Sequence, residues 1–102
     1  MRKAQVFQNG VLAGVLDELS GGCYRFTYEE GYSGEPVSLT MPPTQKAYEF
    51  DGFPPLFEGL LPEGYQLEAL LRRSKIDRND LFGQLIAVGE DVVGALVIRE
   101  IK

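Results

Sequence analysis

The architecture of this chain is decided by one stretch, Phe53-Pro54-Pro55-Leu56-Phe57-Glu58-Gly59-Leu60-Leu61-Pro62-Glu63-Gly64-Tyr65. Within it, Phe57, Leu60 and Leu61 have the spacing that places side chains on one face of a helix. A proline at position 62 disfavours helical backbone in the residue before it, so this helix is predicted to end at Leu61. Residues 62–64 then turn the chain into a second helix, with Tyr65 on an exposed corner at its start. The second helix repeats the apolar face with Leu67, Leu70 and Leu71.

The first part of the chain is predicted to be an antiparallel sheet. Asn9-Gly10 separates two apolar runs, residues 6–7 and 11–16, and Asn-Gly is a strong signal for a tight hairpin. A second turn is expected at residues 20–22, Ser-Gly-Gly. Residues 23–28 follow, where aromatic side chains alternate with smaller or polar ones in the pattern of a half-buried strand.

Two segments follow before the decisive stretch. Residues 37–39 are predicted to form a short strand, which ends before the prolines at positions 42 and 43 because proline cannot donate to a strand ladder. Residues 44–52 are predicted to be irregular.

The rest of the chain is predicted to be helical until near its end. Helices are expected at about residues 54–61, 65–74 and 80–88, with Asp80 as the N-cap of the last one. Gly89 fits the position after a helix end where left-handed backbone is favoured. Residues 92–98 form a continuous apolar run, which predicts a central strand buried on both faces. The predicted fold class is α+β, a small antiparallel sheet with about three helices packed on one side.

Length and charge limit the classes of partner. The chain of 102 residues is predicted to be a single domain, residues 1–102, and its net charge of −5 disfavours direct binding to nucleic acid or to an anionic membrane. No apolar run is long enough to span a membrane, and residues 1–4 do not begin a signal peptide. Cys23 is the sole cysteine, so no intrachain disulfide can form, and a cytoplasmic location is the simplest interpretation.

The sequence also lacks the residue sets that catalysis and cofactor binding require. It contains no histidine, which excludes imidazole bases and histidine-ligated metals, and a single thiol excludes a cysteine-rich zinc site. Neither glycine-rich nucleotide-binding motif occurs. We therefore expect no cofactor, no metal and no enzyme activity.

Several charged or reactive groups have structural interpretations that we favour. Glu58 and Glu63 lack a nearby nucleophile and fit a solvated face, and Glu63 also suits a helix N-terminus. Residues 90–91, Glu-Asp, are expected to solvate a turn, and Cys23 is expected to be an inert, half-buried thiol. One basic cluster complements the dipole at the end of the second helix, with contact to an acidic protein or to partner-held DNA as the alternative. Its members are Arg72, Arg73, Lys75 and Arg78.

The segment Leu60 to Tyr65 resembles a motif of the N-terminal subdomain of HipA-type toxin kinases, in which Leu-Pro-Glu-Gly precedes a bulky residue, often tryptophan. Residues 6–14 are similar to the first hairpin of that family. Further matches in the family's order are Asp80-Leu81-Phe82, Leu85-Ile86-Ala87-Val88, Gly89-Glu90-Asp91 and Gly94-Ala95-Leu96. The resemblance covers nearly the whole chain. One departure is tyrosine at position 65, where the family often has tryptophan.

This resemblance implies a function. Family kinases continue after the last strand into a much larger body, whereas this chain runs from Met1 to Lys102, so we expect a free-standing subdomain. Such a protein resembles the small component of three-gene, HipBST-type toxin–antitoxin systems, made beside a shortened kinase and a helix-turn-helix DNA-binding protein. The resemblance implies an antitoxin that binds a HipA-like serine/threonine kinase toxin and blocks phosphorylation of its target. The targets in the family are aminoacyl-tRNA synthetases.

The inhibitory surface is expected at the turn before the second helix, which would enter the kinase cleft. In this hypothesis the Tyr65 ring fills a pocket and Glu63 pairs with a cleft cation. The predicted partner-binding residues are Phe57, Leu61, Pro62, Glu63, Gly64 and Tyr65. The alternative is a non-inhibitory scaffold that bridges the kinase and the helix-turn-helix protein. A stand-alone enzyme is disfavoured by the missing catalytic groups.

Overall fold

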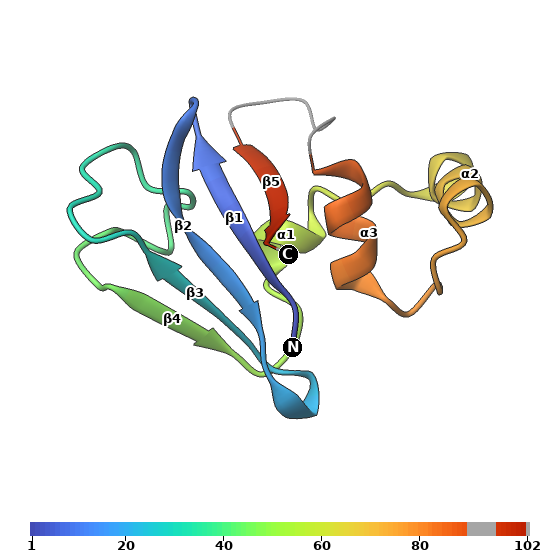
Figure 1. Ribbon diagram of the computed structural model, residues 1–102, viewed down its shortest axis with the longest axis horizontal. Coiled ribbons are helices and arrows are strands. Elements are labelled where there is room, and N and C mark those ends of the chain that lie inside the picture. Colours follow the sequence, from blue (N-terminus) through green and yellow to red (C-terminus); the bar gives the residue numbers. More distant parts are fainter. Residues whose placement is uncertain (90–95, 102) are drawn as a thin grey trace.

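The computed structural model describes residues 1–89 and 96–101. Its strands are β1 (Lys3–Gln8), β2 (Val11–Glu18), β3 (Tyr24–Tyr28), β4 (Ala47–Phe50) and β5 (Leu96–Ile101), and its helices are α1 (Pro55–Glu58), α2 (Gly64–Ser74) and α3 (Leu81–Val88), with a 3-10 turn η1 (Ser20–Gly22). The strands form one antiparallel sheet in the order β4-β3-β2-β1-β5, and the helices pack on one side of it (Figure 1). The α+β fold predicted from the sequence is confirmed.

The two turns predicted between the first three strands are present. Asn9 and Gly10 both have left-handed backbone, with φ of 52° and 83°, and they join β1 to β2 with Gln8 opposite Val11. Because asparagine and glycine tolerate positive φ, this pair forms a tight hairpin turn at little cost. The η1 turn links β2 to β3 through Gly21 at φ 73°.

The core lies between the inner face of the sheet and the helices. Phe26 is its central ring, 4.9 Å from the ring of Tyr28 and 6.1 Å from that of Phe57, measured between centroids. Gly14 makes room for it, since a Cβ there would lie 2.7 Å from Phe26 Cζ. The other large core side chains with no exposure are Val6, Leu16, Phe82, Leu85 and Ile98.

The segment between β3 and the helices differs from the sequence prediction. Residues 37–39 form no strand, because the Val37 N–H donates to the Tyr28 hydroxyl (3.0 Å) instead of to a neighbouring strand. The same hydroxyl donates to the carbonyl of Met41, so one buried tyrosine holds both parts of the loop. Residues 44–52 are not wholly irregular, since β4 lies within them and pairs with β3. The prediction missed β4 because it is only 4 residues long.

The prediction for the last strand was also wrong in its position. Among the described strands, β5 lies at the edge of the sheet, next to β1. Residues 92–95 of the predicted strand lie outside the described residues. α3 covers part of this edge, where the Ile98 N–H donates to the Gly89 carbonyl (3.0 Å). Gly89 is right-handed (φ −59°), not left-handed as predicted. Glycine is required there because a Cβ would lie 2.4 Å from the Ile98 carbonyl oxygen.

The predicted helices are present, with one shorter than expected. α1 ends at Glu58, and residues 59–61 continue as tighter turns, with the Leu61 N–H donating to the Glu58 carbonyl (3.1 Å). α2 and α3 match their predicted ranges closely. Asp80 is the predicted N-cap of α3 and accepts from the Gly83 N–H at 3.0 Å. None of the helices in the described part of the chain is long and apolar enough to cross a membrane.

The exposed corner before α2

The backbone at the start of α2 makes a sharp corner. Glu63 is extended (φ −130°, ψ 163°) and is the N-cap, although its side chain makes no capping bond. Gly64 follows with left-handed backbone at φ 58°. The Glu63 carbonyl accepts from the Gln66 N–H (3.2 Å) and the Leu67 N–H (3.4 Å), which starts the helix at once. A glycine is needed for this change of direction, since other residues adopt positive φ only with strain.

The predicted site residues divide into an exposed tip and a buried base. Tyr65 is 94% exposed, which confirms the exposed corner, and Glu63 and Gly64 are exposed beside it. Leu61 and Pro62 are half-buried, whereas Phe57 is fully buried in the core. Phe57 therefore holds the turn in place from beneath and has no surface for a partner to contact.

Exposure alone does not distinguish Tyr65. Leu39, in the loop between β3 and β4, is 95% exposed, and single exposed apolar side chains are common. What distinguishes Tyr65 is its setting, next to an exposed carboxylate on a turn braced by proline and anchored by a core phenylalanine. Within residues 1–89 and 96–101, Glu63 forms no ion pair, so its charge is available to a partner.

α2 carries the corner away from the sheet. Figure 1 shows α2 at one end of the molecule, with α3 between it and the strands. Leu70 is its one buried side chain, at 2% exposure. The loop that follows is fixed to α3 by Gln84, whose Nε2 donates to the carbonyls of Arg78 (2.9 Å) and Asp77 (3.3 Å). The position of the corner therefore depends on α3.

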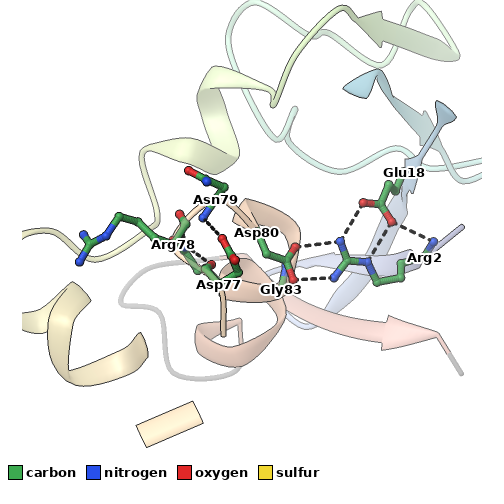
Figure 2. A network of polar contacts seen from close by, with 8 residues as sticks. Arg2, Glu18, Asp77, Arg78, Asn79, Asp80 and Gly83 are labelled. Carbon is green, nitrogen blue, oxygen red and sulfur yellow. Dashed lines mark hydrogen bonds and ion pairs between the residues drawn. The ribbon is translucent and has the colours of Figure 1, made fainter. Parts of the chain in front are cut away.

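An ion network in turn fixes α3 to the sheet. Figure 2 shows Arg2 between Glu18 and Asp80. Its guanidinium donates two bonds to each carboxylate, at 2.9 and 2.8 Å to Glu18 and at 3.1 and 2.8 Å to Asp80, and the Arg2 backbone N–H donates to Glu18 as well (3.3 Å). Its guanidinium also lies 5.0 Å from the Phe82 ring centroid. Hydrogen bonds from Arg2 lower the pKa of both carboxyls, and the two carboxylates raise the pKa of Arg2. No local sequence pattern indicates this network, because Glu18 lies 16 residues and Asp80 lies 78 residues after Arg2 in the chain.

The remaining candidates from the sequence do not form a site together. Glu58 is exposed on α1, and Cys23 is half-buried just before β3. Residues 90–91 lie outside the described residues. Of the basic cluster, Arg78 pairs with Glu68, while Arg72, Arg73 and Lys75 are exposed. No group of carboxylates or thiols among the described residues is arranged to hold a metal ion.

A separate hollow of about 560 Å³ lies between the β1–β2 turn and the loop after β3. Its lining includes Gln8, Leu12 and Tyr32. Three glutamates, at positions 29, 30 and 35, also line it. None of the predicted site residues lines it. The corner before α2 is thus separate from this hollow.

Comparison with known proteins gives the family. The family model described as the HipA N-terminal domain matches residues 4–99. This chain belongs to the HipA N-terminal domain family. It is 35% identical to an uncharacterised protein of Haemophilus influenzae, over all of this chain and 95% of that protein. It is also similar to a solved N-terminal domain of HipA toxin, with 32% identity, a TM-score of 0.79, and 100% and 94% of the two chains covered.

A more distant similarity is to a chain in the Shewanella oneidensis MR-1 complex of HipA, HipB and operator DNA. The TM-score is 0.70 and the identity 22%, so this likeness shows the fold alone. The match covers 94% of this chain and 23% of that chain. The resemblance drawn from the sequence motifs is confirmed, and it links this HipA N-terminal domain to the HipA toxin–antitoxin family.

Proposed function

We propose that this protein is an antitoxin, not an enzyme, and that it binds and inhibits a HipA-like serine/threonine kinase toxin in the cytoplasm. The observation that carries the proposal is the corner from Pro62 to Tyr65, where a 94% exposed aromatic ring stands on a braced turn. The relative from Haemophilus influenzae adds support. This chain covers 95% of that protein, so there the domain makes up nearly the whole protein and is not joined to a kinase body.

The mechanism that fits this corner is steric occlusion. A kinase cleft opens where nucleotide phosphates meet the protein substrate, and a narrow, rigid turn is able to enter that opening. The Tyr65 ring would fill a pocket there, because aromatic rings bury a large area while losing few torsions. Glu63 would pair with a cleft lysine or arginine that otherwise faces phosphate.

The residues beneath the turn give it the stiffness that this mechanism needs. Phe57 is held in the core against Phe26, and Leu61 packs on the same core cluster. Pro62 fixes its own φ, so few conformations remain to be lost on binding. A surface ordered before binding loses less entropy in the complex, which favours tight inhibition.

The proposal is tested by titrating the purified protein into a HipA-like kinase from the same organism while phosphate transfer to its substrate is measured. Inhibition should be complete at a one-to-one ratio, and co-expression should restore growth to cells that the kinase arrests. No binding at micromolar concentration would exclude any role as a partner of that kinase.

A second function, scaffolding, needs the same exposed corner as an interface but no occlusion of the kinase cleft. This protein would then hold a kinase and a helix-turn-helix DNA-binding protein together without inhibiting. In the same titration, a complex that forms while the kinase stays fully active would support the scaffold and exclude the antitoxin.

A further inference from the structure

The two faces of α2 are sharply different. Its inner face carries Leu67, Leu70 and Leu71, of which Leu70 is buried and the other two are half-buried, and α2 contacts α3. The opposite side is what we call the outer α2 face, formed by Tyr65, Ala69, Arg72 and Arg73, and all four residues are exposed. Helix geometry places Tyr65, Ala69 and Arg72 within about 60° of one another around the axis. The tip that carries the aromatic ring thus continues into a stripe that ends in two arginines.

A specific contact deprives Arg72 of its expected partner on the helix. Glu68 lies four residues before Arg72, the spacing at which such a pair normally forms an ion pair on a helix. Glu68 instead binds Arg78, which reaches back from the loop after α2. Throughout residues 1–89 and 96–101, neither Arg72 nor Arg73 forms an ion pair.

We propose that Arg72 and Arg73 bind carboxylates of the same protein groove that accepts Tyr65. This inference rests on the proposed function and extends it from the tip to the whole helix. Seven residues of helix rise about 10 Å, so the acidic groups of the partner lie about two turns along from its aromatic pocket. α2 then lies lengthwise on the kinase surface, and the corner enters the cleft at one end.

Charge favours an acidic protein groove over other anionic partners. The net charge of the chain is −5, so a nucleic acid or an anionic membrane would repel most of the molecule. A protein groove presents acidic groups only locally, so it is able to complement the charges at both ends of α2. The partner's cations would lie near Glu63, and its carboxylates would lie near Arg72. Such a pattern of opposite charges fixes the direction in which the helix binds. Arginine suits the site because its guanidinium binds carboxylate with two parallel bonds.

The test is calorimetry with the purified HipA-like kinase of the same organism. Arg72→Gln/Arg73→Gln should bind about tenfold more weakly than wild type in low salt, and the difference should shrink as salt rises. Lys3→Gln/Lys46→Gln is the matched control, because it removes two exposed cations that belong to the sheet region and not to α2. It should change the affinity by less than about twofold. Glutamine keeps the helix propensity of arginine, and a thermal melt verifies folding.

Each outcome decides the matter. If both double variants lose affinity equally, or if neither does, the arginines do not bind a defined acidic site and the proposal is wrong. If wild type fails to bind the kinase, the proposed function fails and this inference fails with it. A parallel titration with duplex DNA covers the other class of partner. Micromolar binding that disappears in Arg72→Gln/Arg73→Gln would assign the arginines to nucleic acid and overturn the proposal.

A second measurement uses the contact that leaves Arg72 free. Arg78→Gln should release Glu68 to pair with Arg72 and so weaken kinase binding by about twofold to threefold. In a Glu68→Gln background the same change should have no effect. A loss of equal size in both backgrounds would mean that Arg78 itself contacts the kinase, which would contradict the proposed role of Glu68.

Discussion

The sheet end and the α2 end of this small domain are built in opposite ways. At the sheet end, strands and helices share a core of fully buried rings and aliphatic side chains, and Arg2 joins the sheet to α3 through two carboxylates. At the α2 end, Leu70 is the one buried side chain of the helix. The first region holds the fold together, and the second presents side chains to solvent.

This difference is why we propose a binding surface at the α2 end. Surface side chains contribute little to folding, so they are free to change for recognition. The sheet end contributes indirectly, because the corner is oriented through Phe57 in the core and through α3. The comparison predicts that variants at the two ends separate stability from binding.

The largest expected effect is on folding, from Phe26→Ala. This ring has no exposure and contacts the rings of Tyr28 and Phe57, so its removal should cost about 3–5 kcal/mol of unfolding free energy. Urea denaturation measures the loss. Kinase binding per folded molecule should weaken far less than in Tyr65→Ala, because the change reaches the corner only through Phe57. A cost below about 1 kcal/mol would mean that the core is not centred on this ring.

Tyr65→Ala should show the opposite behaviour. An exposed interface anchor of this kind contributes about 2–4 kcal/mol to binding, hence a loss of roughly 30- to 1,000-fold in affinity for the kinase. The unfolding free energy should change by less than about 0.5 kcal/mol. Tyr65→Trp should be tolerated, because tryptophan keeps a flat aromatic surface at this position.

Leu39→Ala is the matched control for Tyr65→Ala. Leu39 is equally exposed but lies in the loop between β3 and β4, and this variant should bind the kinase normally. The two variants are compared by calorimetry and by growth rescue. A Tyr65→Ala variant that melts normally and still protects cells fully would refute the inserted-ring mechanism and favour the scaffold.

Leu70→Ala tests whether α2 is a separate unit of stability. The substitution should cost about 2–3 kcal/mol, because Leu70 is buried but lies outside the main core cluster. Native-state hydrogen exchange should show faster exchange for α2 amides than for the central strands β1, β2 and β3. Equal acceleration in all elements would mean that α2 unfolds only together with the sheet.

Local signals predicted much of the fold. Asn9-Gly10, the alternation from Tyr24 to Tyr28 and the cap at Asp80 each depend on neighbours in sequence, and each is present as predicted. Position in the sheet depends on distant pairing, so the apolar run before Ile98 did not reveal that β5 is an edge strand. Glycine is needed at position 89 because the Ile98 carbonyl approaches it closely in the folded structure. No local sequence pattern encodes this contact.

The candidate site was predicted in the same uneven way. The exposed corner at Tyr65 follows from the helix stop at Pro62 and is confirmed, whereas its role in binding a partner stays a prediction. The spacing of Phe57, Leu60 and Leu61 predicts an apolar helix face but does not say what covers that face. A protein core and a binding partner both fit the same spacing, so the burial of Phe57 could not be predicted. The contact between Glu68 and Arg78 was missed, since it joins a helix to the loop beyond its end.

The smallest expected effect is a pH dependence at the sheet end. Arg2 lowers the pKa of Glu18 and Asp80 from their ordinary values of 4.5 and 3.8. A carboxyl with a lowered pKa in the folded state stabilises the fold above its unfolded pKa and loses that contribution as pH falls through the folded pKa. Stability from this network should therefore be complete above about pH 5 and should decline below it.

Arg2→Met isolates this contribution. The carboxylates are 24% and 32% exposed, so solvent screening should keep the stability difference between wild type and Arg2→Met under about 1 kcal/mol at neutral pH. The difference should shrink as pH falls below about 5 and as salt rises. Lys3→Met is the matched control. Lys3 is next to Arg2 in the chain, is 61% exposed and lies 3.6 Å from Asp17, so its ion pair is weaker than those of Arg2. Urea denaturation at several pH values measures both variants. If the difference for Arg2→Met is constant with pH, packing of Arg2 on Phe82 and not its charge joins α3 to the sheet.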